Sequence, residues 1–120
     1  MARPVERWLY LGRGEIEGQI VSYSIDDTWP KTTNTMRTSH WQIVYDDVQP
    51  NGSKEFRFVD KVDCDRERRA AMVVERYSKT GQLLHRKVIT TADLSWESIA
   101  NDSLEAKADG FACIYELPPK

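Results

Sequence analysis

Two cysteines, two histidines and a few groups of carboxylates are the residues of this chain that could bind a metal or do catalytic chemistry. His40 and His85 lie far apart, and neither belongs to a His-x-x-x-His or Glu-x-x-His array, so we interpret both as ordinary strand residues. Cys64 and Cys113 are enough for one internal disulfide but too few for a four-cysteine zinc site. From spacing alone they are either a bonded pair or two unrelated buried thiols.

The acidic residues form two adjacent pairs and one denser cluster. Asp26-Asp27 and Asp46-Asp47 follow strand-like segments, and neighbours along a strand point to opposite faces, so we interpret both pairs as strand-end turns. The denser cluster consists of Asp60, Asp63, Asp65 and Glu67. It lacks the glycine and the later glutamate of a calcium loop. We therefore expect no metal site and no cofactor.

Familiar catalytic motifs are missing from the sequence. It has no Gly-x-Ser-x-Gly, no phosphate-binding glycine loop and no acid pair at glycosidase spacing, so we expect a protein that is not an enzyme. With 17 Lys and Arg against 19 Asp and Glu, the net charge of -2 does not predict a nucleic-acid partner. No run of about 18 apolar residues predicts a membrane span.

Positive charge concentrates in the middle third of the chain, at Arg66, Arg68, Arg69, Arg76, Arg86 and Lys87. If residues 66–77 and 82–90 pair as a hairpin, these side chains form a basic ridge for polyanions. The interleaved acidic residues favour cross-strand ion pairs instead. Trp29, beside Pro30 in a polar stretch, is the tryptophan we expect to be exposed. The candidate partner-binding residues are Trp29, Arg66, Arg68, Arg86 and Lys87.

Short aromatic and β-branched segments, separated by Gly, Pro, Asn and Asp, predict a β-rich domain. The predicted strands cover residues 7–11, 19–25, 36–48, 55–60 and 83–90, with a hairpin turn at 49–52. Residues 63–77 fit either a helix or a strand, and local propensity does not settle the choice. Ser103 as N-cap and Glu105 in the first turn predict a helix over about residues 103–113.

The order of these elements and several short motifs resembles the surface-adhesin protein E-like family of Gram-negative bacteria. The motifs are Trp8-Leu9-Tyr10, Tyr23-Ser24-Ile25-Asp26, Trp41-Gln42-Ile43-Val44-Tyr45, Asp63-Cys64-Asp65-Arg66-Glu67-Arg68-Arg69, Tyr77-Ser78-Lys79-Thr80-Gly81, Trp96-Glu97-Ser98-Ile99, Ser103 and Cys113. The family has Pro-Gly where this chain has Asn101-Asp102, and the tail from Ile114 to Lys120 extends past the usual last cysteine.

The resemblance implies an α+β fold, in which about six antiparallel strands form a meander and a C-terminal helix is linked to one sheet face by a Cys64–Cys113 disulfide. It also implies that residues 66–77 are a strand. We expect one domain over residues 1–120, with an ordered core from 3 to 115 and a tail from 116 to 120.

In function, the resemblance implies an exported binding module in the periplasm, outer membrane or cell surface, whose signal sequence is absent from this chain. Its expected partner is a protein ligand, such as a host extracellular-matrix or serum protein. A second copy of the chain, forming a homodimer, is left as an open alternative. The alternative is a cytoplasmic or periplasmic accessory factor of the immunity type. No contact residue of the adhesin matches closely enough to be carried over.

Overall fold

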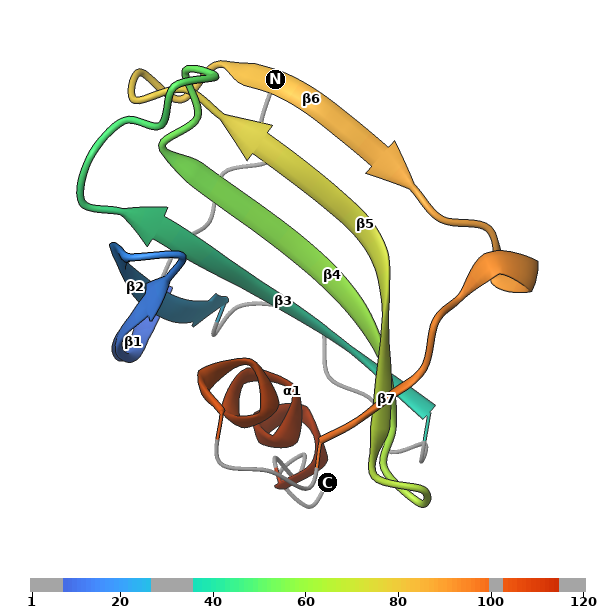
Figure 1. Ribbon diagram of the computed structural model, residues 1–120. Coiled ribbons are helices and arrows are strands. Elements are labelled where there is room, and N and C mark those ends of the chain that lie inside the picture. The colour runs from blue at the N-terminus through green and yellow to red at the C-terminus, as the bar shows by residue number, and fades with distance from the viewer. Residues whose placement is uncertain (1–7, 27–35, 100–102, 115–120) are drawn as a thin grey trace, which may run out of the picture.

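The computed structural model describes residues 8–26, 36–99 and 103–114, which form a β-sheet with a single helix packed on it (Figure 1). Its elements are β1 (Trp8–Ile16), β2 (Gln19–Asp26), β3 (Met36–Tyr45), β4 (Glu55–Asp63), β5 (Arg68–Tyr77), β6 (Leu83–Val88), the 3-10 turn η1 (Thr91–Asp93), β7 (Glu97–Ser98) and α1 (Leu104–Ile114). Trp29 lies outside the described residues, as do Asp27, the tail from 116 to 120 and Arg7, the first residue of the first predicted strand.

The sheet is an antiparallel meander in which β1 to β6 lie side by side in chain order. The two-residue strand β7 pairs with β5 beyond the end of β6. This arrangement confirms the predicted fold class. It also decides the ambiguous segment 66–77: residues 68–77 form β5 and not a helix, whereas 66 and 67 belong to the turn before it. β5 pairs with β4 from end to end, with one register shift between Val59 and Asp60.

The hairpin turn predicted between the third and fourth strands is present. The Gly52 N–H donates to the Gln49 carbonyl at 2.8 Å, and Gly52 has φ of 85°, which a residue with a side chain rarely adopts. The Asn51 side chain accepts a hydrogen bond from the Ser53 N–H at 3.0 Å. Asn and Gly at these positions therefore fix the turn, as their turn chemistry predicts.

The core lies between α1 and one face of β1 to β4 (Figure 1). Its buried members come from β2, β3 and α1 and are Val21, Tyr23, Ile25, Trp41, Ile43 and Ala108. The alternation predicted for β2 and β3 is confirmed, because these strand residues share the face that the helix covers. Gly14 lets the helix approach closely: a Cβ there would lie 3.1 Å from the Tyr23 ring and 3.4 Å from Leu104.

The helix starts as the sequence predicts. The Ser103 hydroxyl oxygen accepts the N–H of Ala106 at 3.0 Å, the pattern of an N-cap. Glu105 in the first turn accepts a hydrogen bond from the Tyr23 hydroxyl at 2.9 Å, which ties this end of the helix to β2. No helix among the described residues is long and apolar enough to span a membrane.

Candidate functional site

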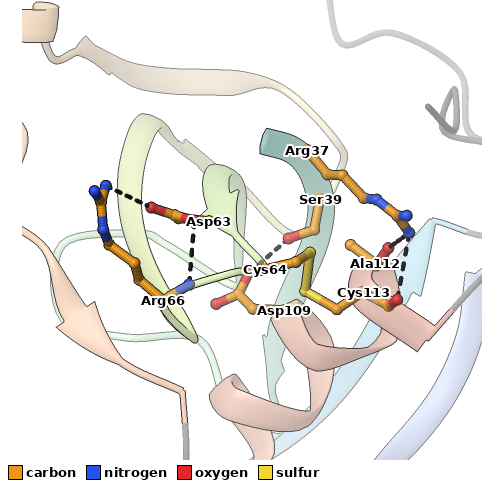
Figure 2. Close-up of a disulfide and its surroundings, with 8 residues drawn as sticks. All are labelled: Arg37, Ser39, Asp63, Cys64, Arg66, Asp109, Ala112 and Cys113. Atoms are coloured by element: carbon orange, nitrogen blue, oxygen red, sulfur yellow. Dashed lines mark hydrogen bonds and ion pairs between the residues drawn. A yellow bond between two sulfur atoms is a disulfide. The ribbon is translucent and has the colours of Figure 1, made fainter. Parts of the chain in front are cut away.

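The C-terminal end of α1 is held on the sheet by a disulfide and an arginine (Figure 2). Cys64 follows β4 and is bonded to Cys113 of α1, 49 positions later in the chain. Arg37 of β3 donates hydrogen bonds to the carbonyl oxygens of Ala112, at 2.6 Å, and Cys113, at 3.3 Å. The last carbonyl groups of a helix lack hydrogen-bond partners within the helix, and the partial negative charge at this end of the helix dipole also attracts a cation. Covalent and polar contacts therefore fix this end together.

A buried pair of carboxyl groups lies between the helix and the sheet. Asp60 of β4 and Asp109 of α1 both have no exposed surface, and Arg69 of β5 lies 3.6 Å from Asp60 Oδ2 and 3.1 Å from Asp109 Oδ2. Trp41 Nε1 donates to Asp60 at 2.7 Å, and the Ser39 hydroxyl donates to Asp109 at 2.6 Å. Three strands and the helix therefore meet at this cluster.

The two buried carboxyl groups, Asp60 and Asp109, face the single positive charge of Arg69, so their charges balance only if one of them keeps a proton. Arg69 also pairs with Glu97 of β7 at 3.1 Å, but the Glu97 side chain is exposed to water. Desolvation, followed by the charge of Asp60 and a hydrogen bond with it, raises the pKa of Asp109 to about 9, although Ser39 and Arg69 act in the opposite direction. The raised pKa favours the protonated, neutral form of Asp109. Since neither buried carboxyl reaches the surface, we assign the cluster a structural role.

A second buried pair joins β2 to β3. His40 Nδ1 lies 2.8 Å from Asp26 Oδ2, and both side chains are buried. The interpretation of Asp26 as a turn residue is wrong, because its carboxyl lies inside the protein at the end of β2. His40 belongs to a strand as predicted, but it is not an ordinary strand residue. No spacing rule links these two positions, since antiparallel pairing of β2 and β3 brings them together.

The candidate partner-binding residues lie in two separate places. Arg66 lies in the turn between β4 and β5 and Arg68 is the first residue of β5, and both pair with Asp63, at 3.5 and 3.2 Å. Arg86 and Lys87 lie on β6, where Arg86 pairs with Glu75 at 3.6 Å and Lys87 stands opposite Val74.

The two pairs of basic residues do not form one ridge. Arg68 and Glu75, the residue opposite Arg86, lie seven positions apart on β5, which corresponds to about 23 Å along a strand. The ion pairs of Arg68 with Asp63 and of Arg86 with Glu75 are cross-strand pairs of the kind that the interleaved acidic residues predicted, whereas Arg66 pairs with Asp63 within the turn. The acidic cluster predicted at residues 60–67 is likewise used by arginines, through Asp60 and Asp63.

The sheet face that α1 covers continues onto β5 and β6, and its character changes from aromatic to basic along the way. Two cross-strand rows show this change, Ile43–Phe56–Arg76–His85 and Trp41–Phe58–Val74–Lys87. The rings of Trp41 and Phe58 stack at 4.3 Å in the core, whereas His85 and Lys87 are exposed.

Strand β6 is the most exposed long element of the described chain. Five of its six residues are exposed, including the apolar Leu84 and Val88 at 40% and 63%. Arg86 and Lys87 were named as candidates from the sequence, but Leu84 and Val88 were not, because their exposure depends on the edge position of β6 in the complete strand order. We take β6, with basic and apolar side chains both accessible, as the candidate binding surface.

Comparison with known proteins adds no relative. No protein-family model matches the chain, and no curated protein or solved structure shows a significant match to it. The resemblance to the adhesin E-like family therefore stays a prediction from the sequence motifs.

Proposed function

We propose that this chain is an exported, non-catalytic binding domain of the surface-adhesin protein E-like kind, which presents β6 to a protein ligand. The observation that carries the proposal is the Cys64–Cys113 disulfide between the sheet and the helix. Disulfides persist in oxidising compartments such as the periplasm and cell surface, and they are rare in the reducing cytosol. The bond therefore supports a site of action outside the cytoplasm.

The position of the disulfide supports a structural rather than a redox role. It joins elements 49 positions apart, and cross-linking a loop of that length restricts the unfolded chain by about 4 kcal/mol in the chain-entropy model. A domain of this size has a total stability of only about 5–15 kcal/mol. Such a bond suits a small domain that must stay folded without cytoplasmic chaperones.

The exposed chemistry of β6 supports a protein ligand. Apolar side chains beside cationic ones, on a strand that pairs with β5, suit a partner that buries both kinds of surface. The sequence-based prediction of host extracellular-matrix or serum proteins as ligands is part of this proposal.

The proposal is tested by measuring binding of the oxidised protein to immobilised extracellular-matrix and serum proteins, with cytosolic proteins of similar charge as controls. We expect saturable binding to at least one extracellular protein and none to the controls. The double variant Cys64→Ser, Cys113→Ser should lose that binding under any condition in which its helix α1 unfolds. Equal binding to both groups, or to neither, would contradict the adhesin-like function, and selective binding to a cytosolic protein would favour an accessory factor instead.

A further inference from the structure

We infer that the outer edge of β6 binds an extended, acidic segment of the protein ligand as an additional strand of the sheet. This inference rests on the proposed protein-binding function and names the chemistry of the partner. β6 is the last strand of the meander, and no described strand pairs with its outer edge. A free sheet edge is a template for adding a strand through main-chain hydrogen bonds.

The register shows which backbone groups β6 offers. The N–H of Ile89 donates to the Met72 carbonyl of β5 at 2.8 Å, so this residue directs its backbone toward the sheet. In a strand, alternate residues direct their backbone groups to the same side. Arg86 and Val88 therefore direct their N–H and carbonyl groups outward, and Lys87 directs its own toward β5. Residues 85–88 pair with β5 without a register shift, so this stretch of the edge is regular.

The other edge of the sheet is less suited to strand addition. In β1 the register shifts between Tyr10 and Gly12, and the strand contains two glycines, Gly12 and Gly14. Both glycines also face Leu104 of the helix. A bulged, glycine-containing strand makes a poor template, which leaves β6 as the preferred edge.

The charges of β6 decide the kind of partner. His85, Arg86 and Lys87 are consecutive and exposed, so an added strand meets cations on both faces. His85 and Lys87 share the face of Arg76, while Val88 lies on the opposite face. A segment that alternates acidic and β-branched residues matches this pattern, with its carboxylates toward Lys87 and its apolar side chains toward Val88.

A second copy of this chain is a poor occupant of the edge. An outward-directed residue of one β6 can pair only with an outward-directed residue of the other, so antiparallel pairing centred on Arg86 places the two Arg86 side chains directly opposite each other. Like charges directly opposite each other destabilise a sheet. The basic residues thus oppose self-pairing and favour an acidic partner.

The test uses a short synthetic peptide that alternates valine and glutamate, with two control peptides. One control peptide has lysine in place of glutamate. The other has methyl groups on alternate backbone nitrogens, on the side of the peptide that would form hydrogen bonds with β6. Amide hydrogen exchange is followed by NMR on the full oxidised chain. We expect the amides of Arg86 and Val88 to exchange at least tenfold more slowly with the glutamate peptide. With either control peptide their exchange rates should not change.

Two variants test the charge of the edge. Lys87→Glu should weaken binding of the glutamate peptide at least tenfold, whereas Lys107→Glu, the same change on an exposed helix residue, should leave it unchanged. Equal binding of the lysine or methylated peptide, or protection at other strands only, overturns the inference. So does protection that appears with rising protein concentration and no peptide, which identifies a second copy as the occupant. If the protein binds an extracellular protein while the amides of β6 stay unprotected, the proposed function stands and only the inference of strand addition at β6 is refuted.

Discussion

The hydroxyl of Ser39 donates a 2.6 Å hydrogen bond to the carboxyl of Asp109, which joins β3 to α1 across 70 positions of the chain. The same carboxyl contacts Arg69 of β5 at 3.1 Å. The helix is therefore attached to the sheet by a buried polar cluster as well as by the disulfide. Each attachment makes a separate prediction about stability.

Removing the disulfide should lower the free energy of unfolding by about 4 kcal/mol, because the unfolded chain regains the freedom of a long loop. The change is the double variant Cys64→Ser, Cys113→Ser, and urea unfolding measures it. Adding a reductant to the unmodified protein should give a similar loss. A difference below about 1 kcal/mol would show that the helix is held by noncovalent contacts alone.

The protein should be more stable at mildly acidic pH than at alkaline pH. Burial and Asp60 raise the pKa of Asp109 from 3.8 in the unfolded chain to about 9 in the folded protein. Between these values the folded state keeps a proton that the unfolded state releases, so the free energy of unfolding falls as pH rises from about 4 to 9.

Asp109→Asn removes this proton and should flatten the pH dependence, which urea unfolding at several pH values measures. Asp47→Asn, at an exposed position, is the matched control and should keep the slope of the unmodified protein. Equal slopes for both variants would contradict a proton on Asp109.

Arg69→Met should cost about 3–5 kcal/mol, because it leaves the buried carboxyls of Asp60 and Asp109 without their cation. Arg13→Met removes another ion-paired arginine, whose partner Asp46 is also exposed, and should cost about 0–1 kcal/mol. Thermal and urea unfolding of the two variants give the comparison. Similar losses would mean that burial of the Arg69 cluster is unimportant.

Gly14→Ala should destabilise the protein by about 1–3 kcal/mol, since the added Cβ meets the Tyr23 ring at 3.1 Å and Leu104 at 3.4 Å. Gly110→Ala is its counterpart inside α1, where a Cβ has no neighbour within 4 Å. That change should stabilise the helix by about 0.5–1 kcal/mol. The two melting temperatures should therefore move in opposite directions, and a shift in the same direction would refute the packing of α1 on β1.

The parts of the fold that depend on local rules were predictable from the sequence. Alternation in β2 and β3 identified the core face, Asn51 and Gly52 identified a hairpin turn, and Ser103 identified the start of the helix. Each of these signals acts over a few residues, so neighbours along the chain are sufficient to detect it. The strand at residues 66–77 lay at the limit of such rules, and its pairing with β4 decided it.

The buried polar clusters depend on pairing between distant residues and were not predictable. Asp109 meets Ser39 and Arg69 only after the helix has docked on the meander, and Asp26 meets His40 only after β2 pairs with β3. The sequence shows which acidic and basic residues are present, but not which of them lie close together in the folded protein. Exposed apolar residues on β6 escaped detection for a related reason, since edge position depends on the complete strand order.

The thiol state of the natural protein in its own cells tests the central proposal most directly. Cells are quenched with acid, free thiols are labelled with a maleimide of large mass, and the protein is detected after electrophoresis. An exported domain predicts no label at Cys64 or Cys113 before reduction and label at both after it. Label at both cysteines without reduction would contradict export to an oxidising compartment.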